Sequence, residues 1–240
     1  PRRAPPNLVR PHMGPLDPAG VETGHRPSPP TPLLEGLDIL HGGACAFRIG
    51  GEGGDLNNSI EGIVIHNHAQ NAWWSKPMSE RGPEDAGSWP DCYSMDGMKP
   101  VKKEGLQPQS EECSTCPLND YGSDGRGKAC KNMRRLYFLF IGQELPHVLS
   151  IPPTSLKAWT KFVVDLANKY KTRAAFAVTR IDATPAANKE SIKFTRTSFS
   201  FVRMCNAAEI EKSLREIPQM KQYSNPPTLK DYVDQPGEPA

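Results

Sequence analysis

The sequence predicts a mainly β protein with one long helix, an α+β chain that folds as a small OB-fold-like barrel with a long loop stapled by zinc. Six segments combine β-branched or aromatic residues with alternating polarity, which is typical of strands. Residues 154–170 instead repeat apolar side chains every three or four positions, which indicates a helix. With the adjacent segments 134–142 and 147–152 counted as one region, the helix falls between the third and fourth strand regions. This is the connectivity of an OB-fold, although other α+β arrangements fit the same strand count.

The predicted elements occur in a simple order. In the segment 61–74 we expect Ile63 and Ile65 on one face and Val64, His66 and His68 on the other. Thr154 or Ser155 is expected to cap the long helix, and a short final helix is expected over 207–216. The strands are predicted over 45–51, 61–74, 134–142, 147–152, 174–185 and 191–202.

The composition divides the chain into three parts. Residues 1–34 contain ten prolines and almost no aromatic residues, which predicts a disordered Pro-rich arm whose removal leaves folding intact. Residues 35–217 are expected to form one OB-like domain whose zinc loop spans 75–133, and residues 218–240 to form a flexible tail. No run of about 18 apolar residues and no export signal are visible, so a cytoplasmic protein with no membrane span is expected.

Four of the six cysteines fall in the one long loop with the spacing C-x20-C-x2-C-x13-C. A loop of this length is uncommon in a compact domain unless something holds it together, and one tetrahedral zinc ion bound by four thiolates would do so. An iron–sulfur cluster, a redox-active pair and four unrelated thiols are the alternatives. Cys45 and Cys205 are expected to be buried apolar residues. The predicted zinc ligands are Cys92, Cys113, Cys116 and Cys130.

Basic residues cluster around the last of these cysteines, and aromatic residues follow them. The net charge of +2 does not by itself indicate nucleic acid, so the argument rests on this local cluster. Single-strand-binding proteins combine cations that follow the phosphate backbone with rings on which bases stack. Trp89 and Trp159 are expected to be structural. The candidate nucleic-acid contacts are Trp73, Trp74, Arg126, Lys128, Lys131, Arg134, Arg135, Tyr137, Lys193, Phe194 and Arg196.

The segments "WPDCYSMDGMKP", "PQSEECSTCPLNDYGSDGRGKACKNMRRLYFL" and "IPPTSLKAW" resemble a family of zinc-binding proteins of bacteriophages and mobile elements. The resemblance covers roughly residues 38–202 and implies an OB-like, single-stranded DNA-binding accessory of replication or recombination in the bacterial cytoplasm. It implies the same four cysteines as metal ligands, carries no catalytic residue, and suggests replication or recombination proteins as further partners. The C-terminus lacks a dense acidic tip ending in an apolar residue, which puts a partner-recruiting tail in doubt.

Two other function classes fit parts of the sequence. "IHNHAQN" suggests an HNH-type, metal-dependent nuclease, but His66 and His68 should share one strand face, whereas such a nuclease needs its histidines on separate elements. A zinc-stapled protein-interaction module is the second alternative. Non-enzymatic binding of single-stranded DNA remains the leading prediction.

Overall fold

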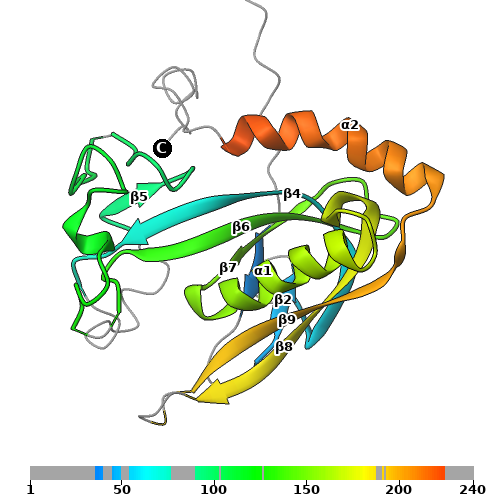
Figure 1. Ribbon diagram of the computed structural model, residues 1–240, viewed down its shortest axis with the longest axis horizontal. Helices are drawn as coiled ribbons and strands as arrows, with labels where there is room; N and C mark the ends of the chain where they lie inside the picture. Colours follow the sequence, from blue (N-terminus) through cyan, green and yellow to red (C-terminus); the bar gives the residue numbers. More distant parts are fainter. Residues whose placement is uncertain are drawn as a thin grey trace, which may run out of the picture. The chain divides into compact units, whose positions relative to one another are not determined.

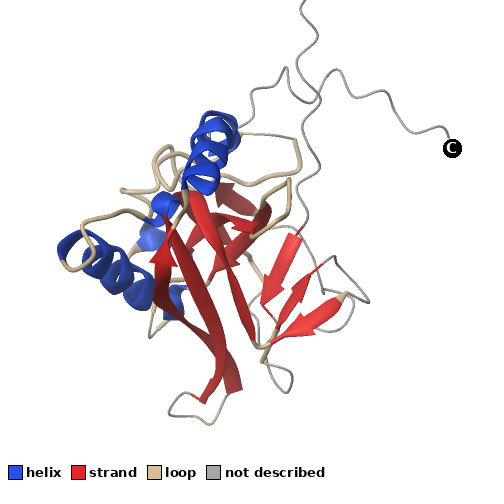
Figure 2. Cartoon of the chain, turned by 90° about the vertical axis from the view of Figure 1, so that its right-hand side faces the viewer, coloured by secondary structure: helices blue, strands red, loops and turns tan. Residues whose placement is uncertain are grey.

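The computed structural model describes residues 36–39, 45–49, 54–76, 90–102, 104–125, 127–187, 191 and 193–224. All nine strands in this part of the chain belong to one strongly curved sheet, which curls into a half-barrel (Figures 1 and 2). The order of eight strands is β3-β2-β1-β7-β6-β4-β8-β9, and β5 pairs with β4 outside this row. The prediction of a mainly β, α+β chain is confirmed.

The strands differ greatly in length. The short ones are β1 (Gly36–Ile39), β2 (Phe47–Ile49), β3 (Asp55–Asn57), β5 (Cys92–Ser94) and β7 (His147–Ile151). The long ones are β4 (Ser59–Trp73), β6 (Lys131–Phe140), β8 (Ala177–Ala187) and β9 (Lys193–Met204). All pairings are antiparallel except that of β1 with β7, which is parallel.

Each face of the sheet is covered by one helix. Helix α1 (Pro153–Asn168) packs Trp159, Phe162 and Leu166 into a core that includes Leu136 and Phe138 of β6. Helix α2 (Ala207–Ser224) covers the other face, where Met220 packs in a cluster that contains Ile63, Ile65 and Tyr137. Because neighbouring side chains of a strand point to opposite faces, these clusters lie on opposite sides of β6.

A β-bulge in β4 decides which face the histidines occupy. The pairing shifts between Val64, opposite Phe138, and His66, opposite Tyr137, so Ile65 is the extra residue. Val64 therefore faces the α1 side, while His66 faces the α2 side with Ile63 and Ile65. The expectation that His66 and His68 share a face with Val64 is wrong, because simple alternation does not include the bulge.

The termini of the two helices also differ from the predictions. Pro152 precedes α1 and no side chain caps the helix. The fully buried hydroxyl of Ser155 instead accepts a hydrogen bond of 3.1 Å from the backbone N–H of Thr197, on the edge of β9. Helix α2 continues past Glu216, through Pro218, to Ser224, and Met220 is 1% exposed. The predicted start of a flexible tail at residue 218 is therefore wrong.

The other predicted segments correspond to observed strands or helices, with ends that move by a few residues. Residues 174–176 form the short 3-10 helix η4 (Ala174–Phe176) before β8 begins. Strands β1, β3 and β5 were not predicted. The arm, residues 1–34, lies outside the described residues. None of the helices described here is both long and apolar enough to cross a membrane.

Candidate metal centre and nucleic-acid interface

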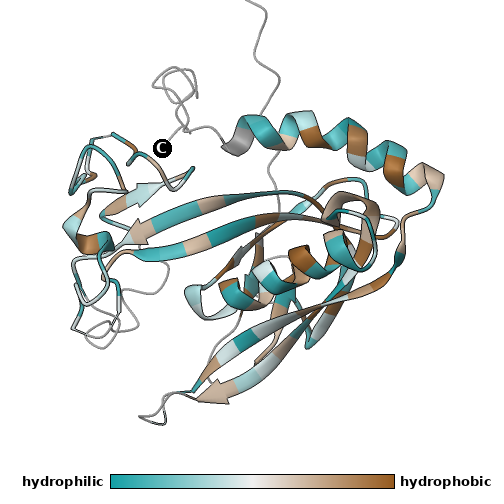
Figure 3. Ribbon diagram, in the orientation of Figure 1, coloured by the Kyte–Doolittle hydropathy of each residue, from teal (hydrophilic) through white to brown (hydrophobic). Residues whose placement is uncertain are grey.

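The outer parts of β4 and β6 form an antiparallel ribbon, which β7 borders along Arg134–Tyr137 and which holds the candidate site at its end. The ribbon comprises His66–Trp73 of β4 and Lys131–Tyr137 of β6. Polar residues dominate it, in contrast to the part of the two strands between the helices (Figure 3). At its end β5 adds to β4, with Trp73 opposite Cys92. The ribbon therefore anchors both ends of the described cysteine loop, residues 90–130.

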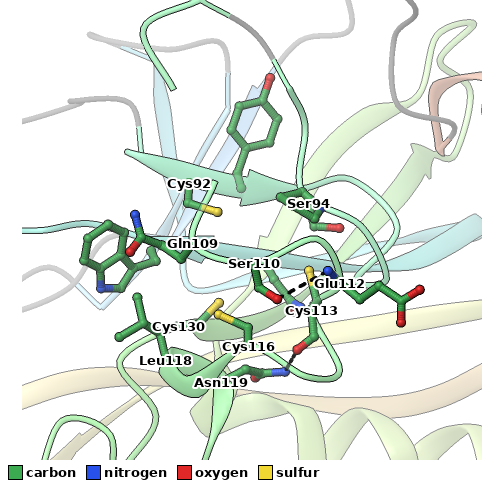
Figure 4. Close-up of a pocket in the computed structure, with 14 residues that line it drawn as sticks. Cys92, Ser94, Gln109, Ser110, Glu112, Cys113, Cys116, Leu118, Asn119 and Cys130 are labelled. Atoms are coloured by element: carbon green, nitrogen blue, oxygen red, sulfur yellow. Dashed lines mark hydrogen bonds between the residues drawn. The ribbon is translucent and has the colours of Figure 1, made fainter. Parts of the chain in front are cut away.

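The four predicted ligand cysteines surround one small pocket in this loop. Cys113, Cys116 and Cys130 are buried and Cys92 is partly buried. Figure 4 shows their sulfur atoms turned toward the same space, which has a volume of about 20 Å³. A volume of this size admits a guest no larger than a water molecule or an ion. The convergence of these residues agrees with the spacing argument.

Short backbone hydrogen bonds hold two of these cysteines in place. The N–H of Cys113 donates to the carbonyl of Met98 at 2.7 Å, and that of Cys130 donates to the carbonyl of Leu118 at 2.8 Å. Leu118 belongs to the 3-10 helix η3 (Pro117–Asn119), which follows Cys116 directly. Gly122 and Gly125 have φ values of +94° and +85°, so the return toward Cys130 uses backbone conformations that favour glycine.

Three asparagines connect the cysteine loop to the ribbon. The Nδ2 of Asn132, on β6, donates to the Oδ1 atoms of Asn71 at 2.8 Å and of Asn119 at 2.9 Å. The Nδ2 of Asn119 in turn donates to the carbonyl of Cys113 at 2.7 Å. Sequence analysis missed this network. The signal that could have found it is the asparagine in each of the motifs "CPLN" and "CKN", close to a predicted ligand.

The electrostatics at Cys92 and Cys130 favour the protonated form of these two thiols. Burial raises the pKa of the Cys130 thiol to about 12, and the neighbouring Cys113, Cys116 and Cys92 contribute to the rise while Lys128 opposes it. Burial, with Cys113 and Cys116, also raises the pKa of Cys92. Thiolates here would therefore repel one another unless a cation neutralised them.

Whether these residues suit a metal depends on both chemistry and geometry. Within the described ranges, no group of three or more His, Cys, Asp or Glu side chains is arranged so that it could hold a metal ion. The thiols thus gather around one pocket without forming a coordination shell. Their chemistry nevertheless fits zinc, because four cysteines with a C-x2-C pair are a common structural zinc set and the pocket is ion-sized.

The predicted basic cluster divides between the two faces of the ribbon. Lys131 forms an ion pair of 2.9 Å with Asp124, and the Nζ of Lys128 donates to Asn119 at 3.2 Å. Arg134 and Arg135 are adjacent in β6 and point to opposite faces. These two candidate contacts therefore do not share one surface of the ribbon. Arg126 lies outside the described residues.

Arg134 faces the α1 side of the sheet. Its Nη1 donates to the Oδ1 of Asn67 at 2.5 Å, and Asn67 lies on that same face of β4. Burial lowers the pKa of the Arg134 guanidinium.

The predicted stacking residues also separate. Trp73 and Trp74, at the end of β4, are partly buried, and Trp73 lines the cysteine pocket. Tyr137 is 1% exposed and belongs to the core beneath α2, which contradicts its expected role as a stacking ring. Trp159 is buried, as predicted, and Trp89 lies outside the described residues.

The remaining candidates lie at the start of β9. Lys193 and Arg196 are exposed, and the guanidinium carbon of Arg196 lies 5.9 Å from the centroid of the partly buried Phe194 ring. Their partners in β8 are Ala187, Thr184 and Ala186 respectively, beyond the last pairing of β8 with β4. They therefore form a second group, on the β8–β9 hairpin, separate from the cysteine loop.

His66 and His68 share one strand face, as predicted. Their ring centroids are 6.1 Å apart, and each lies within 5.7 Å of the Tyr137 ring. Burial, with contributions from His68 and Lys221, lowers the pKa of His66 to about 4. Burial also lowers the pKa of His68, and Arg135 and Arg134 act in the same direction. Burial therefore disfavours the protonated form of both rings.

Comparison of the chain with protein-family models, with curated proteins and with solved structures gave no match.

Proposed function

We propose that this protein binds single-stranded DNA without catalysing a reaction on it, in support of phage or mobile-element replication or recombination. The observation that carries the proposal is the strand order β7-β6-β4-β8-β9 with α1 between β7 and β8. An OB-fold has three sequential strands, a helix and a two-stranded hairpin in this arrangement. Its second and third strands, together with the loops that follow strands one and four, bind oligonucleotides.

The candidate residues fall on the loops that this comparison singles out. The cysteine loop connects β4 to β6, the equivalents of strands one and two. Lys193, Phe194 and Arg196 follow the turn between β8 and β9, the equivalents of strands four and five. Fold likeness alone does not establish function, so the chemistry of these residues matters. Both loops offer cations beside aromatic rings, which suits a single strand better than a sugar chain.

The barrel proposed here is OB-like and open. In a closed OB barrel the fifth strand returns to the third, whereas β7 pairs with β1 and β9 pairs with β8 alone among the described strands. The parallel strand β1 occupies the place of the closing strand. The outer edge of β9 is partly covered by α1, through Ser155.

We further propose that one zinc ion per chain is held by Cys92, Cys113, Cys116 and Cys130. Zinc would fix the cysteine loop and neutralise its thiolates, with no catalytic role. The support is the convergence of four thiols on an ion-sized pocket and the hydrogen bonds that position their backbones. The sulfur atoms would need to move into tetrahedral geometry, which side-chain rotation permits at the ends of short loops.

The test measures the anisotropy of a fluorescein-labelled single-stranded oligonucleotide. The double variant Lys193→Ala/Arg196→Ala should weaken binding to all sequences alike and flatten the salt dependence, because phosphate contacts are lost. Lys161→Ala is the matched control, since Lys161 is an exposed α1 residue whose ion pair among the described residues is with Asp165 of its own helix. If the double variant binds as tightly as the wild type, the β8–β9 hairpin does not contribute to the interface.

The same samples test the nuclease alternative. Single- and double-stranded oligonucleotides are incubated with magnesium or manganese and analysed on a denaturing gel. We expect both substrates to remain intact. Cleavage that disappears in His66→Ala would replace the binding proposal with a metal-dependent nuclease.

A further inference from the structure

We infer that Asn119 and Asn132 are positioning residues for the metal centre, because they hold the backbone of Cys113 against the ribbon. The inference rests on the proposed zinc site and goes beyond it, since it assigns a role to side chains that would not bind the ion themselves. We call Asn71, Asn119 and Asn132 the asparagine network. Each of these amides can both donate and accept hydrogen bonds, which allows the three to form a chain.

Asn132 is the centre of the network. It lies directly opposite Asn71 in the pairing of β6 with β4, so the two side chains point to the same side of the sheet. The Nδ2 of Asn132 donates to the Oδ1 of Asn71 at 2.8 Å and to the Oδ1 of Asn119 at 2.9 Å. Because an amide nitrogen carries two hydrogens, both donors of Asn132 are used. One side chain of the ribbon thus reaches a second strand and the cysteine loop at once.

The two branches of the network converge on one backbone contact of the cysteine loop. The Nδ2 of Asn119 donates to the carbonyl of Cys113 at 2.7 Å, the bond drawn between these residues in Figure 4. The Nδ2 of Asn71 donates to the carbonyl of Gly97 at 3.3 Å. Gly97 directly precedes Met98, whose carbonyl accepts the N–H of Cys113 at 2.7 Å. The network therefore holds both sides of the contact that places Cys113.

Asn119 also connects the other predicted ligands. Its backbone N–H donates to the carbonyl of Cys116 at 2.9 Å, so Asn119 is bonded to the backbones of both cysteines of the C-x2-C pair. The preceding residue, Leu118, accepts the N–H of Cys130 at 2.8 Å. A shift of Asn119 would therefore disturb three of the four predicted ligands together.

The segment that receives the other branch packs closely on β4. Gly97 has a φ of +74°, and a Cβ atom built on it would lie 2.9 Å from the Cβ of Ala69 in β4. This spacing leaves no room for a side chain between the loop and the strand. The cysteine loop thus meets the ribbon at a defined position, which the asparagine network relays to Cys113.

Two donors fix the orientation of the Asn119 amide. Its Oδ1 accepts from the Nδ2 of Asn132 at 2.9 Å and from the Nζ of Lys128 at 3.2 Å. Turning the amide over would place its NH2 group against these donors and would break the bond to the Cys113 carbonyl. The network therefore sets the position of Cys113 through neutral groups, which leave the charge of the thiolates to the metal ion.

The test measures zinc affinity in the full chain, produced in zinc-containing medium, by competition with a chelator of known affinity. Asn119→Ala and Asn132→Ala should each weaken zinc binding about 10- to 100-fold, the usual effect of removing a group that orients a metal ligand. The same proteins produced with cobalt(II) should show an altered d–d absorption spectrum, because a displaced Cys113 distorts the tetrahedral site. Asn168→Ala, at the exposed end of α1, is the matched control.

A double variant tests whether the two asparagines act through one chain of hydrogen bonds. The loss in Asn119→Ala/Asn132→Ala should be smaller than the product of the two single losses, since residues that share a network are not additive. Losses that multiply fully would overturn the claim that Asn132 acts through Asn119. Weaker zinc binding with an unaltered cobalt spectrum in both single variants would overturn the positioning role.

The outcomes separate the inference from the proposed function. If the wild-type protein holds zinc and both single variants release it like Asn168→Ala, the inference is overturned while the zinc site stands. If the wild-type protein binds neither zinc nor cobalt, the zinc site and the inference fail together. Circular dichroism identifies a variant that fails to fold. Asn119 belongs to neither core cluster, so Asn119→Ala decides if Asn132→Ala does not fold.

Discussion

Single residues decide which chemistry each face of the ribbon presents. The spacing of four cysteines was enough to predict that they meet in space, because a C-x2-C pair and two further loop cysteines have few other arrangements in a folded loop. The orientation of the histidines was not predictable in the same way. It depends on the extra residue Ile65, and the alternating pattern of the sequence gives no sign of a bulge at that position.

The burial of Tyr137 was missed for a related reason. The segment "RRLYFLFIG" is apolar on both faces beyond Arg135, so its sequence does not distinguish a ring in the core from a ring on the surface. The helix that covers Tyr137 begins only at Ala207, and the fold alone brings Met220 against the ring.

At the scale of one residue, His66 should make stability depend on pH. Its pKa is lowered from 6.5 to about 4 in the folded protein, chiefly by burial. Between these pH values the unfolded chain binds the proton more readily, so the free energy of unfolding should rise with pH across this window. The stabilising contribution of the neutral His66 ring to the free energy of unfolding is complete above about pH 6.5 and is lost as the pH falls to about 4. Urea unfolding of wild type and His66→Gln checks it; equal pH slopes for the two would contradict the expectation.

A second residue-scale prediction concerns the close approach of β4 and β6. A Cβ atom at Gly62 would lie 2.4 Å from the carbonyl oxygen of Leu139 and 2.7 Å from the Phe138 ring. Gly62→Ala should therefore lower the free energy of unfolding by about 1–3 kcal/mol, as overpacking does. Its neighbour Glu61 is exposed, and Glu61→Ala serves as the control in the same denaturant titration. A loss no larger than that of the control would show that the strands can separate without strain.

At the scale of elements, length and periodicity explain what the sequence could predict. Strands β8 and β9 and helix α1 are long enough for their patterns to be recognised. Strands β1, β3 and β5 have only three or four residues, too few for alternation to stand out from a loop, and they form because a neighbouring strand offers an edge to pair with. Pro218 is tolerated inside α2, where it was expected to end the helix, because Met220 beyond it gains a place in the core.

The end of α2 provides the prediction for this scale. If residues 218–224 belong to the folded domain, Met220→Ala should lower the free energy of unfolding by about 2–5 kcal/mol, the usual effect of truncating a buried methionine. Gln222 is exposed two residues away, so Gln222→Ala is the matched control. Similar unfolding curves for the two variants would indicate that residues 218–224 are a loosely attached tail.

At the scale of the whole molecule, the cysteine loop is a long insertion between β4 and β6, and its described residues contribute to neither apolar core cluster. Its described contacts include short backbone hydrogen bonds, the asparagine network, the four thiols and side-chain bonds such as the ion pair of Lys102 with Glu111. We therefore expect elemental analysis to find one zinc per chain and a strong chelator to lower the thermal midpoint. Cys113→Ser should lose the metal, whereas Cys205→Ala should keep it, because Cys205 belongs to the separate core beneath α2.

Two results would count against zinc. A brown protein containing iron and sulfide would indicate an iron–sulfur cluster at the same cysteines. A metal-free protein in which all six thiols titrate freely would contradict both the zinc site and the iron–sulfur cluster, and no metal would then stabilise the loop.

The central claim is that the half-barrel binds single strands through stacking and phosphate contacts. The most direct measurement is the change in intrinsic tryptophan fluorescence when single-stranded and duplex oligonucleotides of the same sequence are titrated at two salt concentrations. Trp73 and Trp74 lie beside the cysteine loop, so quenching should accompany binding, while Trp159 is buried in the core. We expect quenching by the single strand at lower concentrations than by the duplex, weak dependence on sequence, and weaker binding at the higher salt concentration. Preference for the duplex, or no quenching by either oligonucleotide, would contradict the claim.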